Sequence, residues 1–125
     1  MKNATLFSIE LFDRLVSKTM TTIKCAIDEG RIARLRPQAG KWFRSLRQSA
    51  QVTVIELAEQ VGVDTDEVGA YEHGVEAVPA ALYPDFAAVF GVSVQDFAKS
   101  CLMFENPSAY EALFGSLPED LRAAA

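Results

Sequence analysis

The sequence predicts an all-α protein. Apolar residues recur at steps of three and four over residues 5–29, which places them along one side of a helix. Over residues 41–104, short helical segments are separated by Gly and by Asp, Ser or Thr, the residues that end and start helices. No stretch alternates apolar and polar residues for long, as a half-buried strand would. These three observations favour a helical bundle over a sheet-based core.

Size and composition are those of one domain with additional helices. The chain has 125 residues, half of them hydrophobic, so it can bury a core. Two cysteines, Cys25 and Cys101, do not make a disulfide framework, and we expect both to behave as small buried hydrophobes. No apolar run approaches the ~20 residues of a membrane span and no signal peptide is recognisable, so we expect a cytoplasmic, nucleoid-associated location.

Residues 1–30 are predicted to form an N-terminal helix that ends at Gly30. Its apolar stripe is made by Ile9, Phe12, Val16, Met20, Ile23 and Ile27, widened by Phe7, Leu11 and Leu15. Two interpretations are open: the stripe covers the core of the domain, or it is a face that binds a second copy or a partner protein.

Residues 31–40 are predicted to be a basic linker, because Pro37 and Gly40 should break a continuing helix. The main domain is predicted over residues 41–104. Residues 105–125 form a C-terminal extension. It should contain a short helix that starts after Pro107, is capped by Ser108 and ends at Gly115, followed by a tail with Pro118 at a helix start.

Capping signals define two helices joined by a glycine turn in the first half of the domain. Thr53 and Glu56 have the T-x-x-E spacing that opens a helix, and Gly62 supplies the turn after it. Asp64 and Glu67 repeat the spacing and should open the next helix, which ends at Gly74. Two helices joined in this way have the layout of a helix-turn-helix motif.

This part of the chain resembles the helix-turn-helix domain of the phage repressor/Cro type, also called the Xre family. The resemblance covers residues 40–100. It rests on Phe43-Arg44, Leu46-Arg47, Thr53, Leu57-Ala58, Gly62-Val63, Val68, Glu72, Gly74, Pro79, Phe86-Ala87, Phe90, Gly91-Val92, Ser93 and Phe97. It implies a five-helix lambda-repressor-like bundle with an extra N-terminal helix. It also implies a dimer that binds operator DNA and regulates transcription, a role frequent in prophages and mobile elements.

By the same resemblance, the helix over residues 65–73 would enter the major groove of double-stranded DNA. Its outward positions are then the candidates for contacts with bases: Thr65, Asp66, Glu67, Gly69, Ala70 and His73. Two departures from the family stand out. Val54 replaces a usual Gln that contacts the DNA backbone, and the positions from Ala70 to Glu76 carry no Lys or Arg.

Charge is divided unevenly along the chain. Residues 1–48 hold ten Lys or Arg and four acids, whereas residues 51–98 hold nine acids and no Lys or Arg. DNA affinity depends on basic side chains at phosphates. If the protein binds DNA, the positive charge must therefore come from outside residues 51–98. The candidates for phosphate contacts are Arg31, Arg34, Arg36, Lys41, Arg44, Arg47 and Thr53. The alternative is a solvated face that balances the acidic body, with Arg47 paired internally. Trp42 among them is expected in the core.

The acids of the recognition segment also have two interpretations. Asp64 and Glu67 suit a helix start, and Glu72 suits a hydrogen bond inside the bundle. Asp66 or Glu67 can instead accept a hydrogen bond from a cytosine amino group. If the acids meet a protein rather than DNA, a basic partner such as a polymerase subunit, a second regulator or a toxin fits.

The sequence therefore predicts a DNA-binding transcription regulator, with an acidic protein-interaction module or co-regulator as the alternative. We expect double-stranded DNA and a homodimer or protein partner, and no membrane. We expect no enzyme, cofactor, small-molecule substrate or metal, because His73 is the only histidine and neither zinc-ligand spacing nor a phosphate loop is present.

Overall fold

The computed structural model is all-helical over the residues it describes, which are residues 2–125 and, for side chains, all of these except 2–10, 12, 21, 22, 24 and 25. No strand occurs in this range, so the predicted all-α class is confirmed. The elements are α1 (Lys2–Ser49), α2 (Val54–Val61), α3 (Thr65–Glu72), a 3-10 helix η1 (Ala80–Leu82), α4 (Tyr83–Phe90), α5 (Val94–Glu105), α6 (Pro107–Phe114) and α7 (Glu119–Ala124).

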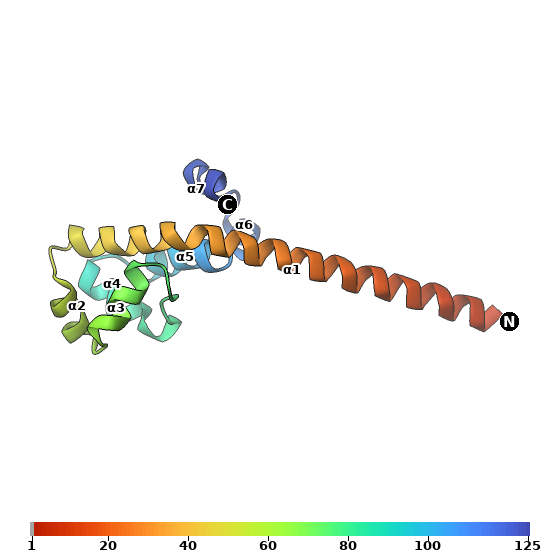
Figure 1. The fold of residues 1–125 in the computed structure, drawn as a ribbon, viewed down its shortest axis with the longest axis horizontal. Coiled ribbons are helices and arrows are strands. Elements are labelled where there is room, and N and C mark those ends of the chain that lie inside the picture. Colours follow the sequence, from red (N-terminus) through yellow and green to blue (C-terminus); the bar gives the residue numbers. More distant parts are fainter. Residues whose placement is uncertain (1) are drawn as a thin grey trace.

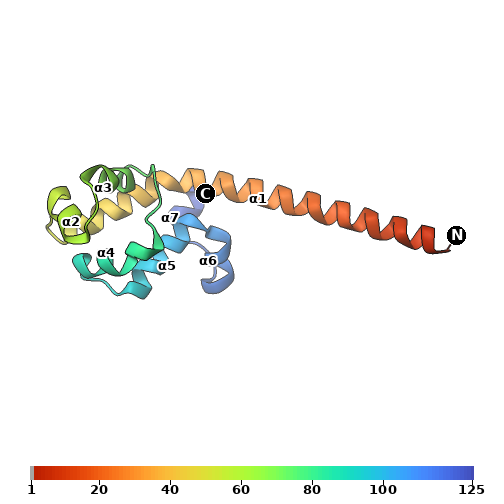
Figure 2. The same cartoon turned by 90° about the horizontal axis from the view of Figure 1, so that it is seen from below.

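A bundle of short helices is built on one end of a single long helix. In Figures 1 and 2, helices α2 to α7 gather around the C-terminal half of α1, and its N-terminal half projects away from them. No helix in the described part of the chain is long and apolar enough to cross a membrane. The side chains of Phe7, Ile9, Phe12 and Cys25, which entered the sequence predictions, lie outside the described residues.

The predicted helix end at Gly30 and the predicted linker over residues 31–40 are wrong, because α1 is continuous through Pro37 and Gly40. A proline inside a helix costs about 3 kcal/mol. Contacts on both sides of the proline offset this cost. Leu35 is fully buried and Phe43 is almost so, and the Nε of Arg36 donates a hydrogen bond to the carbonyl of Gly74, 3.1 Å away. Tertiary packing has overridden the local signal.

Gly40 is a packing residue rather than a helix breaker. A Cβ atom placed on Gly40 would lie 2.3 Å from the carbonyl oxygen of Glu72, and one on Gly74 would lie 2.3 Å from the carbonyl oxygen of Arg36. Both distances are far shorter than a carbon–oxygen contact allows. Gly74 also has a positive φ of 69°, which disfavours any side chain. The two glycines therefore let α1 and the end of α3 touch backbone to backbone.

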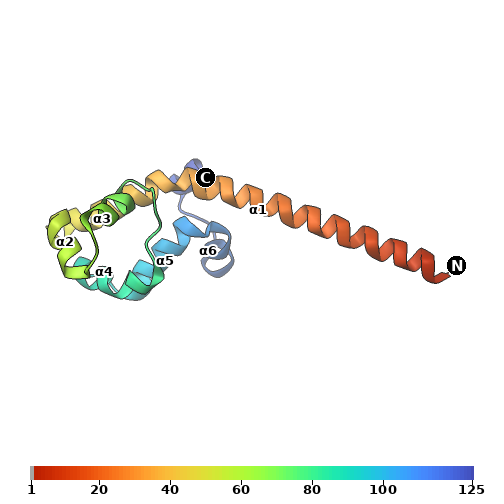
Figure 3. The same ribbon diagram turned by 60° about the horizontal axis from the view of Figure 1, so that its bottom comes forward.

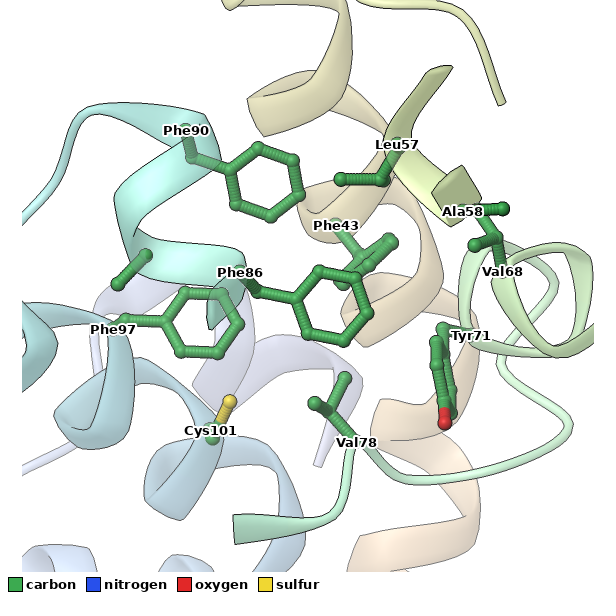
Figure 4. Packing of buried hydrophobic residues seen from close by; sticks show 11 residues of the cluster. Phe43, Leu57, Ala58, Val68, Tyr71, Val78, Phe86, Phe90, Phe97 and Cys101 are labelled. Carbon is green, nitrogen blue, oxygen red and sulfur yellow. The ribbon is translucent and has the colours of Figure 1, made fainter. Parts of the chain in front are cut away.

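The main core is centred on Phe43 of α1. Its ring meets those of Tyr71, Phe86 and Phe90 edge-on, with centroids 5.7, 5.2 and 5.4 Å apart. Figure 4 shows these rings converging from α1, α3 and α4. The other buried members, contributed mainly by α2 to α5, are Leu57, Ala58, Val68, Val78, Ala87, Phe97 and Cys101. Every helix from α1 to α5 thus contributes to one core.

A second, smaller core joins the C-terminal extension to α1. Leu35, Phe104, Leu117 and Leu121 are buried together. Trp42 packs against both cores, with its ring 5.3 Å from that of Phe97 and 5.5 Å from that of Phe104. The predicted core position of Trp42 therefore agrees with the structure, apart from partial exposure.

The extension follows its predicted outline, with one error in the cap. Helix α6 begins at Pro107 and its C-cap is Gly115, as expected. Its cap is Asn106, whose side-chain oxygen accepts from the amide of Ala109. Ser108 instead donates to the carboxylate of Asp28 on α1, 2.5 Å away. The serine is thus used for a long-range contact that the local pattern could not indicate.

Replacing Gly40 by alanine should strongly destabilise the protein. The added methyl group has no room between two backbones, so we expect a loss of at least about 3 kcal/mol in the free energy of unfolding, measured by denaturant titration. Gly69→Ala is the matched control, because a Cβ there meets nothing within 4 Å. It should be neutral or stabilise α3 by up to about 1 kcal/mol. Equal effects of the two substitutions would contradict the close contact.

Candidate nucleic-acid interface

Helices α2 and α3 are joined by a short turn whose geometry follows the capping signals only in part. The hydroxyl of Thr53 accepts from the amide of Glu56 at 3.1 Å, so the predicted cap of α2 is confirmed. Gly62 ends α2 in the left-handed conformation, with φ 83°. Asp64 occupies the N-cap position of α3, but its side chain makes no capping hydrogen bond. The capping hydrogen bond expected of Asp64 is therefore not formed, whereas Glu67 does lie in the first turn of α3, where an acid suits the helix dipole.

Helix α3 has one face in the core and one face in solvent. Val68, Tyr71 and Glu72 are buried. The six candidates for base contacts lie outside the core: Thr65, Asp66, Glu67 and His73 are exposed, and Gly69 and Ala70 are partly so. Because all six belong to one short helix and its cap, the structure does bring them together on one surface.

Two features determine how closely a partner can approach the exposed surface of α3. The Nδ1 of His73 lies 2.7 Å from the carbonyl oxygen of Gly69, so its ring is folded back against its own helix. Gly69 has open space above it, which gives the middle of α3 a low profile. A partner surface can therefore approach the backbone of α3 closely between Thr65 and His73.

A buried ion pair holds α3 against α1. The Nε of Arg47 lies 2.5 Å from the carboxylate of Glu72, and the two side chains are only 16% and 5% exposed. A second guanidinium nitrogen of Arg47 donates to the carbonyl of Val52 at 3.1 Å. Arg47 therefore ties together α1, the loop before α2 and α3. The structure supports its predicted internal pairing, which occupies two of the three guanidinium nitrogens.

Three further arginines of the basic segment are also used within the protein. Arg31 pairs with Glu111 of α6 at 2.5 Å and lies 3.8 Å from Asp28. The Nε of Arg34 donates to the carbonyl of Ala125, and that of Arg36 to the carbonyl of Gly74. Arg36 contacts the chain just after α3, whereas the partners of Arg31 and Arg34 lie in the C-terminal extension, so the three do not gather on the exposed face of α3. The predicted continuous phosphate track over residues 31–47 is not formed by them.

The remaining candidates are Lys41, Arg44 and Thr53, all exposed. Lys41 lines a groove with Met103, Asp120 and other residues of α5 and α7, on the side of α1 away from α3. Arg44 follows Gly40 by four positions and precedes Arg47 by three, so it shares the side of α1 that contacts α3. Arg44 is thus the exposed basic side chain of this segment placed next to the α2–α3 surface.

Sequence reasoning missed a partly buried polar cluster beside the core, formed by Tyr83, Cys101 and Glu105. The hydroxyl of Tyr83 donates to the carboxylate of Glu105 at 3.3 Å. Burial, and then the nearby Glu105, raise the pKa of the Cys101 thiol to about 12, and burial also raises the pKa of Glu105. These groups come from α4 and α5, and only the fold joins them.

The described side chains offer no metal centre. No group of three His, Cys, Asp or Glu side chains in that part of the chain is placed to hold a metal ion. The cavity bounded by Arg36, Tyr71, Cys101 and Glu105 has a volume of about 20 Å³, which is room for about one water molecule.

A scan against protein-family models and searches of curated proteins and of solved structures found no match to this chain. The likeness to the phage repressor/Cro type therefore depends on the residues of this chain alone.

Neutralising the buried carboxylate should unfold the α3 region. Glu72→Gln leaves the guanidinium of Arg47 buried without its partner, and we expect a loss of about 3–5 kcal/mol in the free energy of unfolding. Glu67→Gln removes an exposed carboxylate from the same helix and should change stability by no more than about 0.5 kcal/mol. Chemical denaturation of the three proteins measures both, and a tolerated Glu72→Gln would show that the pair is not needed to hold α3.

Proposed function

We propose that this protein is a transcription regulator that binds double-stranded DNA with the outward face of α3 as its reading surface. The observation that carries the proposal is the combination of a solvent-facing α3 with a rigid attachment of its other face. The Arg47–Glu72 pair and the contact between Gly40 and Gly74 fix the orientation of α3 on α1. A helix held in this way can present the same side chains to a groove each time.

Specificity would come from Thr65, Asp66 and Glu67, which stand exposed at the first turn of α3. A threonine can contact several bases, and a carboxylate accepts a hydrogen bond from the amino group of cytosine. The low profile at Gly69 lets the helix backbone approach the base edges. Sites with cytosine at a fixed position are therefore expected.

Affinity would be low for one copy. Arg44 and the exposed helix starts at Thr53 and Asp64 can contact phosphates, whereas residues 51–98 carry nine acids and no Lys or Arg. Few counterions are then released, so the logarithm of the binding constant should fall with the logarithm of salt concentration with a slope of only about −1 per copy.

The first test is selection from a genomic DNA pool with purified protein at two salt concentrations. Enriched sites with affinity that falls as salt rises support the proposal. Absence of any enriched sequence at low salt would overturn autonomous DNA binding. Thr65→Ala should then change which of the enriched sites are preferred, because it alters a side chain that faces bases rather than phosphates.

Arg44→Ala should weaken binding to all DNA sequences alike and make the salt slope shallower by about 1. Arg122→Ala is the matched control: it also removes one exposed arginine, but from α7. It should leave both affinity and slope unchanged. If Arg44→Ala changed only the preference among sites, the assignment of Arg44 to a phosphate would be wrong.

A second candidate function is a co-regulator that binds a basic protein surface through α3. The specific observation in its favour is that four of the six basic candidates have internal partners, which leaves the α2–α3 surface acidic with Arg44 at its edge. Charge complementarity would then select the partner. The DNA selection separates the two functions, because a co-regulator enriches no sequence on its own.

A further inference from the structure

The N-terminal half of α1 stands in solvent with no described segment beside it. In all three views it extends away from the bundle, and at 1.5 Å per residue its projecting part is about 40 Å long. In a protein, most of the stability of such a helix comes from packing of its apolar face rather than from helix propensity. The projecting part of α1 nevertheless leaves six large apolar side chains exposed, each by 46–56%: Leu11, Leu15, Val16, Met20, Ile23 and Ile27. An exposed apolar stripe on a projecting helix is typical of a helix that packs against other helices in an assembly.

The apolar stripe faces away from the bundle, so it does not cover the core. At 100° per residue, Val16, Ile23 and Ile27 lie roughly 160–180° around α1 from Phe43, which is buried in the core. Of the two interpretations of this helix, the core-covering one is therefore not compatible with the geometry. A partner can lie along the stripe as far as Ile27, beyond which α6 and the end of the chain contact α1 at Asp28, Arg31 and Arg34.

Four exposed side chains in the stripe have the spacing of a two-helix seam. Val16, Met20, Ile23 and Ile27 follow one another at steps of four, three and four residues, which is the spacing of two successive heptads. This series matches its own reverse. When two copies run in opposite directions, Val16 of each lies opposite Ile27 of the other, and Met20 opposite Ile23.

Charge at the two ends of the seam selects the direction of pairing. Asp13 lies one heptad before Met20, and Arg34 one heptad after Ile27. Parallel chains would place each of these beside its own copy, and would do the same for Lys41, which is in line with Ile23 five turns further on. Antiparallel chains bring Asp13 of one copy opposite Gly30 of the other, one turn from Arg34, whose Nε donates to the carbonyl of Ala125. Opposite charges then replace like charges.

We propose that residues 13–30 of α1 pair with the same residues of a second copy as an antiparallel two-helix seam. Self-complementarity of this kind is what a two-fold symmetric interface requires. The pairing places the two bundles at opposite ends of the shared helices. It does not depend on the proposed DNA binding, because it is measured on the protein alone.

The mass of the full-length protein in solution, by sedimentation equilibrium over a concentration series, tests the pairing. The wild-type chain should be a dimer. Ile23→Glu should raise the dissociation constant about 100-fold or more, because a carboxylate is buried in the seam without a partner. Leu11→Glu is the matched control, since Leu11 and Ile23 are both 48% exposed, but Leu11 lies outside the seam.

Each outcome decides the proposal. A dimer that is lost in Ile23→Glu and kept in Leu11→Glu supports it. A wild-type monomer at every concentration overturns it, and so does a dimer that survives Ile23→Glu, or one that both variants abolish. Thermal unfolding of the bundle should be the same in the two variants, which separates loss of pairing from loss of folding.

Cross-linking tests the direction. Val16→Cys and Ile27→Cys are made separately in a Cys25→Ser background. Cys101 can stay, because it is buried and the pKa of its thiol is about 12. On oxidation, a mixture of the two proteins should give a disulfide-linked heterodimer, and Val16→Cys alone should give none. A homodimer linked through Val16→Cys would show parallel chains and overturn the antiparallel arrangement.

Discussion

The position of α3 depends on its attachment to α1, and the rest of the domain is arranged around that attachment. Arg47 and Glu72 form an ion pair that is almost closed to solvent, and Gly40 and Gly74 allow the backbones to touch beside it. A buried charge pair is costly to desolvate and tolerates little misalignment. Together with the rings around Phe43, it specifies one orientation of α3 rather than a family of them.

The pairing of arginines within the protein also explains why the α2–α3 surface is acidic. Arginines of α1 are used to bind other parts of the chain: Arg31 holds α6, Arg36 holds the end of α3, and Arg47 holds Glu72. The long helix is therefore a scaffold along which both cores are assembled. Most of its arginines stabilise the fold, which leaves Arg44 as the basic side chain beside the candidate reading surface. The two candidate functions therefore differ chiefly in the charge of the partner that this surface would bind.

Much of the local structure could be predicted from the sequence, because it depends on residues within four positions of one another. The cap of α2 at Thr53, the turn at Gly62 and the start of α6 at Pro107 all appear as expected. Pro84 falls in the first turn of α4, where its missing amide is harmless. The candidate base-contacting residues also share one surface, since helical periodicity alone decides which sides of α3 face outward.

What the sequence by itself determined is the helical class, most helix starts and the outward face of α3. Only the tertiary structure decided that Pro37 and Gly40 lie inside one continuous helix, that Asp64 caps nothing with its side chain, and that most of the basic segment is paired. The physical reason is distance along the chain. A hydrogen bond to Glu111 or a backbone contact with Gly74 comes from 34 to 80 residues away, and such contacts outweigh the intrinsic preference of a proline or a glycine.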